Sequence, residues 1–384
     1  AAVVPRRTRK GTKITNLPFR ALRYAFGILA IQVARDDVDR RHLRAVSRIA
    51  QPTQRRPSWG VSIRARPGCQ HRLQKDTPAS GEVSLVKFPT ICGNKEENVY
   101  NTIHDVAIVT DSTCDIPAEL VEQYRLTVVP LYVLWGDEEL VDGVDIDVDT
   151  FFARLPDDPI HPQTSQPTPG DFVRAIQKLD AREVLIITLT KALSGTHESA
   201  VQAREEVDVP VHVFDSRSLS MGLGWQVLAA ARAREEGADV AGMIAAAEYV
   251  RENTSLLLTV DTLEYLHRGG RIGSAAKLLG SVVQLKPLLS VNHESGTLEA
   301  VGKVRTRKRA LLRIVEGTFE RIDPNKPTRA AVIHGAAPED SQELLQALRR
   351  RCPTVEPLVS TVTPVLGVHG GPGTVGIAAY NRED

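Results

Sequence analysis

From Val106 onward, the chain alternates between short apolar runs rich in β-branched residues and segments with the period of an amphipathic helix. This alternation constrains the fold strongly, because strands separated by helices at such spacing form a parallel sheet with helices on both faces. Ligands of such sheets bind beyond the carboxyl ends of the strands, where the polar loops lie. The predicted strands are 106–113, 126–135, 183–190 and 209–216, and the predicted helices are 116–126, 171–179 and 194–207.

The second half of the chain has a different order of elements. Two consecutive helices precede an apolar segment, a hairpin, a long helix and a further α/β unit. These segments are 220–236, 239–253, 255–266, 287–304, 305–322 and 330–380. We therefore predict an α/β fold with two domains, 105–253 and 254–384, and we expect the final strands to pack back near their junction.

Residues 1–104 differ in charge from the rest of the chain. They contain 20 Lys and Arg residues against 7 Asp and Glu residues. Residues 105–384 therefore contain 28 basic and 40 acidic residues, although the whole chain has a net charge of +1. They show no sustained period, and Pro and Gly separate the arginines. This composition predicts a basic, disordered extension. Transit peptides and nucleic-acid-binding tails share it, so the role of the extension stays open.

The cysteines give no sign of a disulfide framework or a metal site. Cys69, Cys92, Cys114 and Cys352 share no CxxC spacing and no clustered histidines. No run of the chain reaches the length of uninterrupted apolar sequence that a transmembrane helix needs. We therefore expect a cytoplasmic protein with no metal, no cofactor and no transmembrane helix.

Two loops bring hydroxyl groups to the start of a predicted helix. Thr164 and Ser165 lie beside a proline-rich turn, and Ser194, Gly195 and Thr196 follow the strand 183–190. Hydroxyls and free backbone N–H groups at a helix N-terminus can bind an anionic group. Alternatively, these residues simply cap their helices.

Two further loops are rich in glycine. HRGGRIG (267–273) carries Arg271, and VLGVHGGPGTVG (365–376) carries His369 after an apolar segment that we expect to be a strand. An imidazole at such a place can donate a hydrogen bond to an anion. The alternative is a surface turn with solvated arginines and a structural histidine. The glycines that would allow close backbone approach are Gly269, Gly270, Gly370 and Gly371.

The order and spacing of five loops resemble the DegV family from about residue 105 to the end of the chain. The loops are DSTCDIP (111–117), TSQPTPGDF (164–172), LSGTHESA (193–200), TLEYLHRGGRIG (262–273) and HGGPGTVG (369–376). The resemblance implies a bacterial lipid carrier with a Rossmann-like domain, a smaller α/β domain, and a long-chain fatty acid in a tunnel near their junction. It also implies that a separate fatty acid kinase phosphorylates the bound carboxyl group for phospholipid metabolism, so that the chain itself has no catalytic residue.

The same resemblance assigns roles to individual residues. It places the fatty acid carboxylate on Thr164, Ser194 and His369, with their neighbours Ser165, Gly195 and Thr196, and it assigns Arg271 to the interaction with the kinase. The four glycines named above then support the loops. The chain departs from the pattern at Gly370, where many members have Thr, and in the extension 1–104, which the family lacks.

Two other functions compete with this interpretation. A serine hydrolase or esterase would use Ser194 as nucleophile and His369 as base, with Asp111 or Asp215 as the third member, although no Gly stands two residues before Ser194 as in a nucleophile elbow. A nucleic-acid binder would use the extension and VRTRKRA (304–310). The excess of acidic residues over 105–384 opposes phosphate binding. We therefore expect no nucleic-acid partner and at most transient membrane contact.

Overall fold

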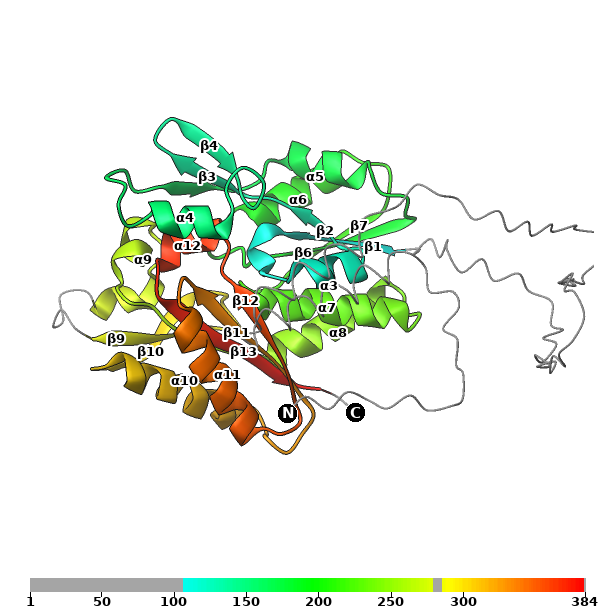
Figure 1. The fold of residues 1–384 in the computed structure, drawn as a ribbon. Helices are drawn as coiled ribbons and strands as arrows, with labels where there is room; N and C mark the ends of the chain where they lie inside the picture. The colour runs from blue at the N-terminus through cyan, green and yellow to red at the C-terminus, as the bar shows by residue number, and fades with distance from the viewer. Residues whose placement is uncertain (1–105, 279–284, 383–384) are drawn as a thin grey trace, which may run out of the picture. The chain divides into compact units, whose positions relative to one another are not determined.

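The computed structural model describes residues 106–278 and 285–382 (Figure 1). The predicted extension 1–104, with Cys69 and Cys92, lies outside these residues. The strands are β1 (Val106–Asp111), β2 (Thr127–Val129), β3 (Tyr132–Trp135), β4 (Glu138–Val141), β5 (Gln163–Ser165), β6 (Glu183–Thr188), β7 (Val211–Asp215), β8 (Ser255–Thr259), β9 (Lys286–Val291), β10 (Leu298–Val304), β11 (Thr328–Gly335), β12 (Val355–Thr361) and β13 (Thr374–Asn381). The helices are α3 (Ala118–Gln123), α4 (Val148–Arg154), α5 (Pro169–Ile176), α6 (Thr196–Arg204), α7 (Met221–Glu235), α8 (Val240–Asn253), α9 (Glu264–Arg268), α10 (Arg307–Arg321), α11 (Pro338–Arg351) and α12 (Pro364–Gly370), with 3-10 turns at Ser112–Cys114 and Gly273–Leu278.

The first sheet is parallel throughout, as the alternation of strands and helices predicts. Its strands stand in the order β2-β1-β6-β7. Helices α5 and α6 cover one face, and α3, α7 and α8 lie on the other (Figure 1). The central strands β1 and β6 are apolar because both of their faces are buried.

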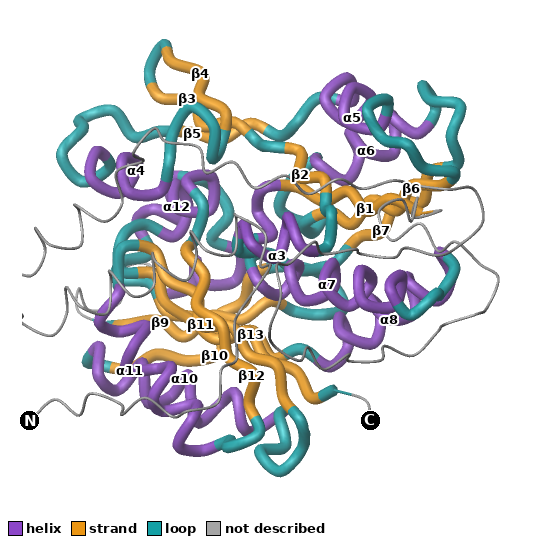
Figure 2. The backbone as a smooth tube through the Cα atoms, turned by 45° about the vertical axis from the view of Figure 1, so that its right-hand side comes forward, coloured by secondary structure: helices purple, strands orange, loops and turns teal. Residues whose placement is uncertain are grey.

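The second sheet has the order β10-β9-β8-β13-β11-β12. Only β11 and β12 are parallel to each other, and all other neighbours are antiparallel. Helices α10 and α11 pack on one face, while α7 and α8 separate the other face from the first sheet (Figure 2). The indole Nε1 of Trp225 on α7 donates a hydrogen bond of 3.0 Å to the carbonyl of Ala378 on β13. The predicted α/β class, with a parallel sheet and a second sheet, is confirmed.

Two predicted strands are wrong. The segment 126–135 is not one strand, because Pro130 cannot donate to a ladder and the chain leaves β2 to enter a third, antiparallel sheet with the order β4-β3-β5. The apolar residues before His369 form the short helix α12, which has Pro364 in its first turn. Both differences matter for the site, since β5 carries Thr164 and α12 carries His369.

Among the helices within the described ranges, none combines the length and the apolar character needed to cross a bilayer.

Candidate functional site

A cavity of about 260 Å³, which we call the loop cavity, lies where the polar loops of the chain meet. Its wall is mostly apolar, with a small group of polar side chains, as in sites for amphipathic small molecules. The apolar lining residues are Leu131, Leu189, Leu193, Leu219, Leu266, Leu298, Val365 and Leu366. The polar lining residues are Thr113, Thr164, Ser165, Gln166, Ser194, Arg271 and His369.

His369 is a partly buried polar group of the loop cavity. Its Nε2 lies 3.0 Å from the hydroxyl of Thr164, and its Nδ1 has no hydrogen-bond partner among the described residues. Burial and, to a smaller extent, the nearby charges of Arg271 and His161 together lower the pKa of His369 to about 4. The imidazole is therefore neutral at physiological pH, and it can donate one hydrogen bond and accept another.

Two buried carboxylates hold the helix that carries His369. The first N–H groups of α12 receive no cap from Thr363, the residue at its N-cap. Instead, the N–H of Thr363 donates to Asp115 at 3.0 Å, and the N–H of Val365 donates to Asp142 at 3.3 Å. These long-range caps satisfy backbone donors that would otherwise be buried without partners.

These two carboxylates and that of Asp111 have raised pKa values. Burial raises the pKa of Asp115 to about 7, and it raises those of Asp111 and Asp142 to about 6. Hydrogen bonds from neighbouring hydroxyls and N–H groups oppose this rise without cancelling it. Asp111 also accepts from the N–H of Leu189, a lining residue, at 2.7 Å. The walls of the loop cavity therefore depend on three buried acids.

The loop that carries Ser194 is held by a hydrogen bond between two of its own hydroxyl groups. The Oγ of Ser194 lies 2.9 Å from the hydroxyl of Thr196, which is fully buried and does not line the loop cavity. Gln166 crosses from the neighbouring loop and donates to Ser199 at 3.1 Å. A Cβ at Gly195 would come within 2.1 Å of the Oε1 of Gln166. The absence of a Cβ at Gly195 therefore leaves room for the side-chain amide of Gln166 in its observed position.

Arg271 brings a positive charge to the same end of the loop cavity. Its guanidinium donates to two backbone carbonyls, that of Leu193 at 3.1 Å and that of Gly269 at 2.8 Å. It makes no ion pair with a carboxylate of another described residue. The charge is thus fixed in place by neutral acceptors, and it stays available to an anionic ligand.

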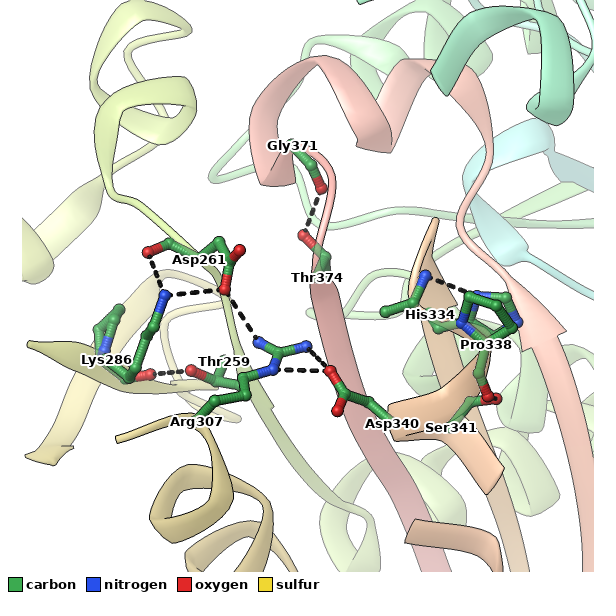
Figure 3. A network of polar contacts seen from close by, with 12 residues as sticks. Thr259, Asp261, Lys286, Arg307, His334, Pro338, Asp340, Ser341, Gly371 and Thr374 are labelled. Carbon is green, nitrogen blue, oxygen red and sulfur yellow. Dashed lines mark hydrogen bonds and ion pairs between the residues drawn. The ribbon is translucent and has the colours of Figure 1, made fainter. Parts of the chain in front are cut away.

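The glycine turn after His369 rests on a polar network (Figure 3). A Cβ at Gly373 would come within 2.8 Å of the carboxyl carbon of Asp261. Lys286 donates to this carboxylate at 2.8 Å. Arg307 lies 3.6 Å from it and forms an ion pair of 2.6 Å with Asp340. Four separate segments of the second sheet and its helices therefore support the turn that positions His369.

The structure brings five of the predicted site residues to the wall of the loop cavity, namely Thr164, Ser165, Ser194, Arg271 and His369. The others support these residues: Gly269 packs on the imidazole, Gly370 lies against Thr374, Gly371 lies against Tyr265, and Gly270 has a φ of +69° in open space. The sequence interpretation missed Thr113, Gln166, Asp115 and Asp142, and it considered Asp111 only as a member of a catalytic triad. The motifs DSTCDIP and TSQP contain four of these five residues, so the motifs were the signal for them.

The hydrolase arrangement is not assembled in the described residues. The imidazole of His369 pairs with Thr164, and the hydroxyl of Ser194 pairs with Thr196. The carboxylate of Asp111 accepts from Thr113 and Leu189, so it does not orient the imidazole. Ser194, His369 and Asp111 are therefore not joined by hydrogen bonds as a nucleophile, a base and an acid.

No group of three or more His, Cys, Asp or Glu suited to a metal ion occurs in 106–278 and 285–382. Cys114 and Cys352, the cysteines that fall within these ranges, are buried and unpaired with each other.

Known proteins resemble this chain over nearly all of the residues that the structure describes. A DegV family profile, described as an uncharacterised protein family, matches residues 105–382. A DegV domain-containing protein of Streptomyces coelicolor is 41% identical over 282 residues, which cover 72% of this chain and 99% of that protein. Protein DegV of Bacillus subtilis is 34% identical over 277 residues, covering 71% of this chain and 98% of that protein.

Solved structures show the same fold. One is described as "Fatty Acid Binding of a DegV family Protein from Thermus thermophilus"; it is 34% identical with a TM-score of 0.68 and covers 72% of this chain and 100% of its own. Another is described as "DegV, a fatty acid binding protein from Bacillus subtilis"; it is 33% identical with a TM-score of 0.68, and the match covers 72% of this chain and 99% of that chain. The profile match and the identity across nearly the full length of these relatives lead to one conclusion: the chain belongs to the DegV family.

Proposed function

We propose that the loop cavity binds a long-chain fatty acid and that the protein presents the bound carboxylate to a separate fatty acid kinase. The observation that carries this proposal is that Thr164, Ser194, Arg271 and His369 line one cavity, whose apolar lining residues are leucines and Val365. Such a cavity matches a molecule with an anionic head and an apolar tail. The relatives from Thermus thermophilus and Bacillus subtilis, both described as binding fatty acids, support the same ligand class.

The tail accounts for most of the expected affinity. Each buried CH₂ group contributes about 0.8 kcal/mol, so a tail of about 14 methylenes contributes roughly 11 kcal/mol before the cost of association. No covalent link is needed at that magnitude. Leu131, Leu189 and Leu298 line the loop cavity and support this assignment, because a tail needs apolar contacts.

The head group requires polar partners because a buried carboxylate without hydrogen bonds costs several kcal/mol. Thr164 and Ser194 offer hydroxyl donors, the neutral imidazole of His369 offers one N–H, and Arg271 offers charge. A neutral histidine also avoids a tight ion pair that would draw electron density from the carboxylate. One carboxylate oxygen can then remain nucleophilic toward the ATP of the partner kinase, in the cytoplasm, for use in phospholipid metabolism.

The decisive experiment is the analysis of lipid in the purified full chain. We expect mass spectrometry after denaturation to show one fatty acid for each protein molecule, and we expect delipidated protein to bind added oleate. Trapping with hydroxylamine should then detect acyl phosphate when the cognate kinase and ATP are added. Protein that carries no acyl chain and binds no oleate would overturn the proposal, whereas bound lipid without acyl phosphate would overturn the kinase step alone.

A further inference from the structure

A second concave surface lies on the far face of the six-stranded sheet, between α10 and α11. This groove has a volume of about 410 Å³. Its floor is apolar and comes from both helices: Leu311, Leu312 and Val315 from α10, with Leu344 and Ala347 from α11. The side chain of Leu312 is 45% exposed, which places a large apolar group at the solvent side of the groove. We refer to this surface as the helix groove.

The two helices run side by side in the same direction. Near their N-termini, Arg307 forms an ion pair with Asp340. Near their C-termini, the guanidinium of Arg351 lies 4.9 Å from the ring centroid of Phe319. These contacts fix α10 and α11 side by side near both of their ends, and a third helix can lay a stripe of apolar side chains into the groove between them.

The rim of the helix groove is basic. Lys308, Arg309 and Arg350 line it and are exposed, and none of them forms an ion pair with another described residue. Glu343 is the one acidic residue of the lining, so the cations are in excess. An apolar floor with unpaired cations at its edge fits an amphipathic helix that carries Asp or Glu beside its apolar stripe. Residues 1–104 of this chain do not fit, because Lys and Arg outnumber Asp and Glu there.

The helix groove begins beside the support of the loop cavity. Its lining residue Thr306 immediately precedes Arg307, which reaches Asp261, and Asp261 lies against the glycine turn that follows His369. The Thr306 end of the helix groove therefore lies near the turn that positions His369. This position suits the protein that uses the bound carboxylate.

We propose that the helix groove is the docking site for an amphipathic, acid-flanked helix of the kinase that phosphorylates the bound fatty acid. This inference rests on the proposed function, because it names the kinase as the occupant. Apolar contacts at Leu312 provide most of the affinity. The charges of Lys308, Arg309 and Arg350 raise the rate of association and make it specific for an acidic helix.

The test compares variants of the full, oleate-loaded chain in binding to the fatty acid kinase purified from the source organism. Leu312→Asp should weaken binding at least about tenfold, and the double variant Lys308→Glu/Arg309→Glu should weaken it severalfold and reduce its dependence on salt. Val144→Asp and Lys178→Glu are controls, since each places an acidic side chain at an exposed position outside the helix groove. The fatty acid content of all variants should equal that of the wild type.

Several results would overturn the docking site. If the kinase binds the groove variants as tightly as the wild type, the proposed function stands and the helix groove is not the docking surface. If the wild type carries fatty acid but does not bind the kinase, both the kinase step and the groove assignment fail. If Leu312→Asp instead abolishes self-association, or binding to vesicles of phosphatidylglycerol and phosphatidylcholine, the occupant is a second copy or a membrane. The charge variants keep the test valid should Leu312→Asp unfold, because Lys308 and Arg309 are exposed.

Discussion

The hydroxyl of Thr164 lies 3.0 Å from Nε2 of His369, although 205 residues separate them in the sequence. Thr164 belongs to β5 of the small antiparallel sheet, and His369 belongs to α12, which leads into the six-stranded sheet. The hydrogen bond therefore joins two sheets at one end of the loop cavity. It also fixes the orientation of an imidazole whose other nitrogen has no partner among the described residues.

This bond predicts a modest and specific loss of affinity on Thr164→Val. The substitution keeps the shape of the side chain and removes the hydroxyl, which is worth about 0.5–1.5 kcal/mol in a neutral hydrogen bond. The dissociation constant for oleate should therefore rise roughly 2- to 10-fold, as measured by titration of delipidated protein. Thr164→Ser retains the hydroxyl and is the matched control. Equal affinities of the Val and Ser variants would show that the hydroxyl does not contribute to binding.

Gly195→Ala should disturb the contact between the two hydroxyl loops. The added Cβ would overlap the amide of Gln166, at 2.1 Å from Oε1, so Gln166 must move and release Ser199. We expect weaker oleate binding in Gly195→Ala and partial recovery in Gly195→Ala/Gln166→Ala, where the overlapping amide is gone. Gly170→Ala serves as a control, because its nearest neighbour is the flexible side chain of Arg174. Additive effects of the two substitutions would contradict a direct steric coupling.

The departure from the family pattern at Gly370 has a steric explanation. A Cβ at this position would come within 2.6 Å of the hydroxyl of Thr374, which donates to the carbonyl of Gly371. Gly370→Thr should therefore lower the melting temperature of the protein, and Thr374→Ala in the same chain should restore part of the loss. Thermal unfolding of the single and double variants measures both effects. A fully stable Gly370→Thr variant would show that the turn relaxes at little cost.

Part of this architecture could be predicted from sequence. The strands of the parallel sheet are continuous apolar runs, so their existence follows from local pattern, and the loop after β6 carries Ser194. Thr164 lies instead on β5 of the small antiparallel sheet. The break at Pro130 divides one apolar run between two sheets, and a local pattern does not specify which sheet a strand joins.

The buried acids were harder to recognise. Asp111, Asp115 and Asp142 stand in polar sequence that reads as solvated turn, and only the tertiary packing shows that they are enclosed. The apolar lining of the loop cavity was equally hidden, because a leucine that faces a ligand and a leucine that faces the core have the same local pattern.

These acids predict that stability depends on pH in an unusual direction. Burial raises the pKa of Asp115 from 3.8 to about 7 and those of Asp111 and Asp142 to about 6. The native state therefore holds these protons more tightly than the unfolded chain does. Their contribution to the free energy of unfolding is fully present below pH 3.8 and is lost as the pH rises through the folded pKa values.

Asp115→Asn removes one of these titrations and keeps an acceptor for the N–H of Thr363. The variant should gain stability relative to the wild type between about pH 5 and about pH 8, by an amount on the order of a few kcal/mol. Urea unfolding at a series of pH values measures the difference. Asp149→Asn, on the exposed first turn of α4, is the control variant. Parallel stability curves for wild type and Asp115→Asn would contradict the assignment.

The place of β13 in the six-stranded sheet sets an order on the assembly of the protein. This strand follows every other element in sequence, yet it lies between β8 and β11. The strands on its two sides pair with β13 and not with each other, so they stay separate halves until it is inserted. His369 precedes this strand by only a few residues and reaches Thr164 only once the strand is in place. During synthesis, the contact between His369 and Thr164 is therefore among the last to form, and a chain that is still growing lacks the complete wall of the loop cavity.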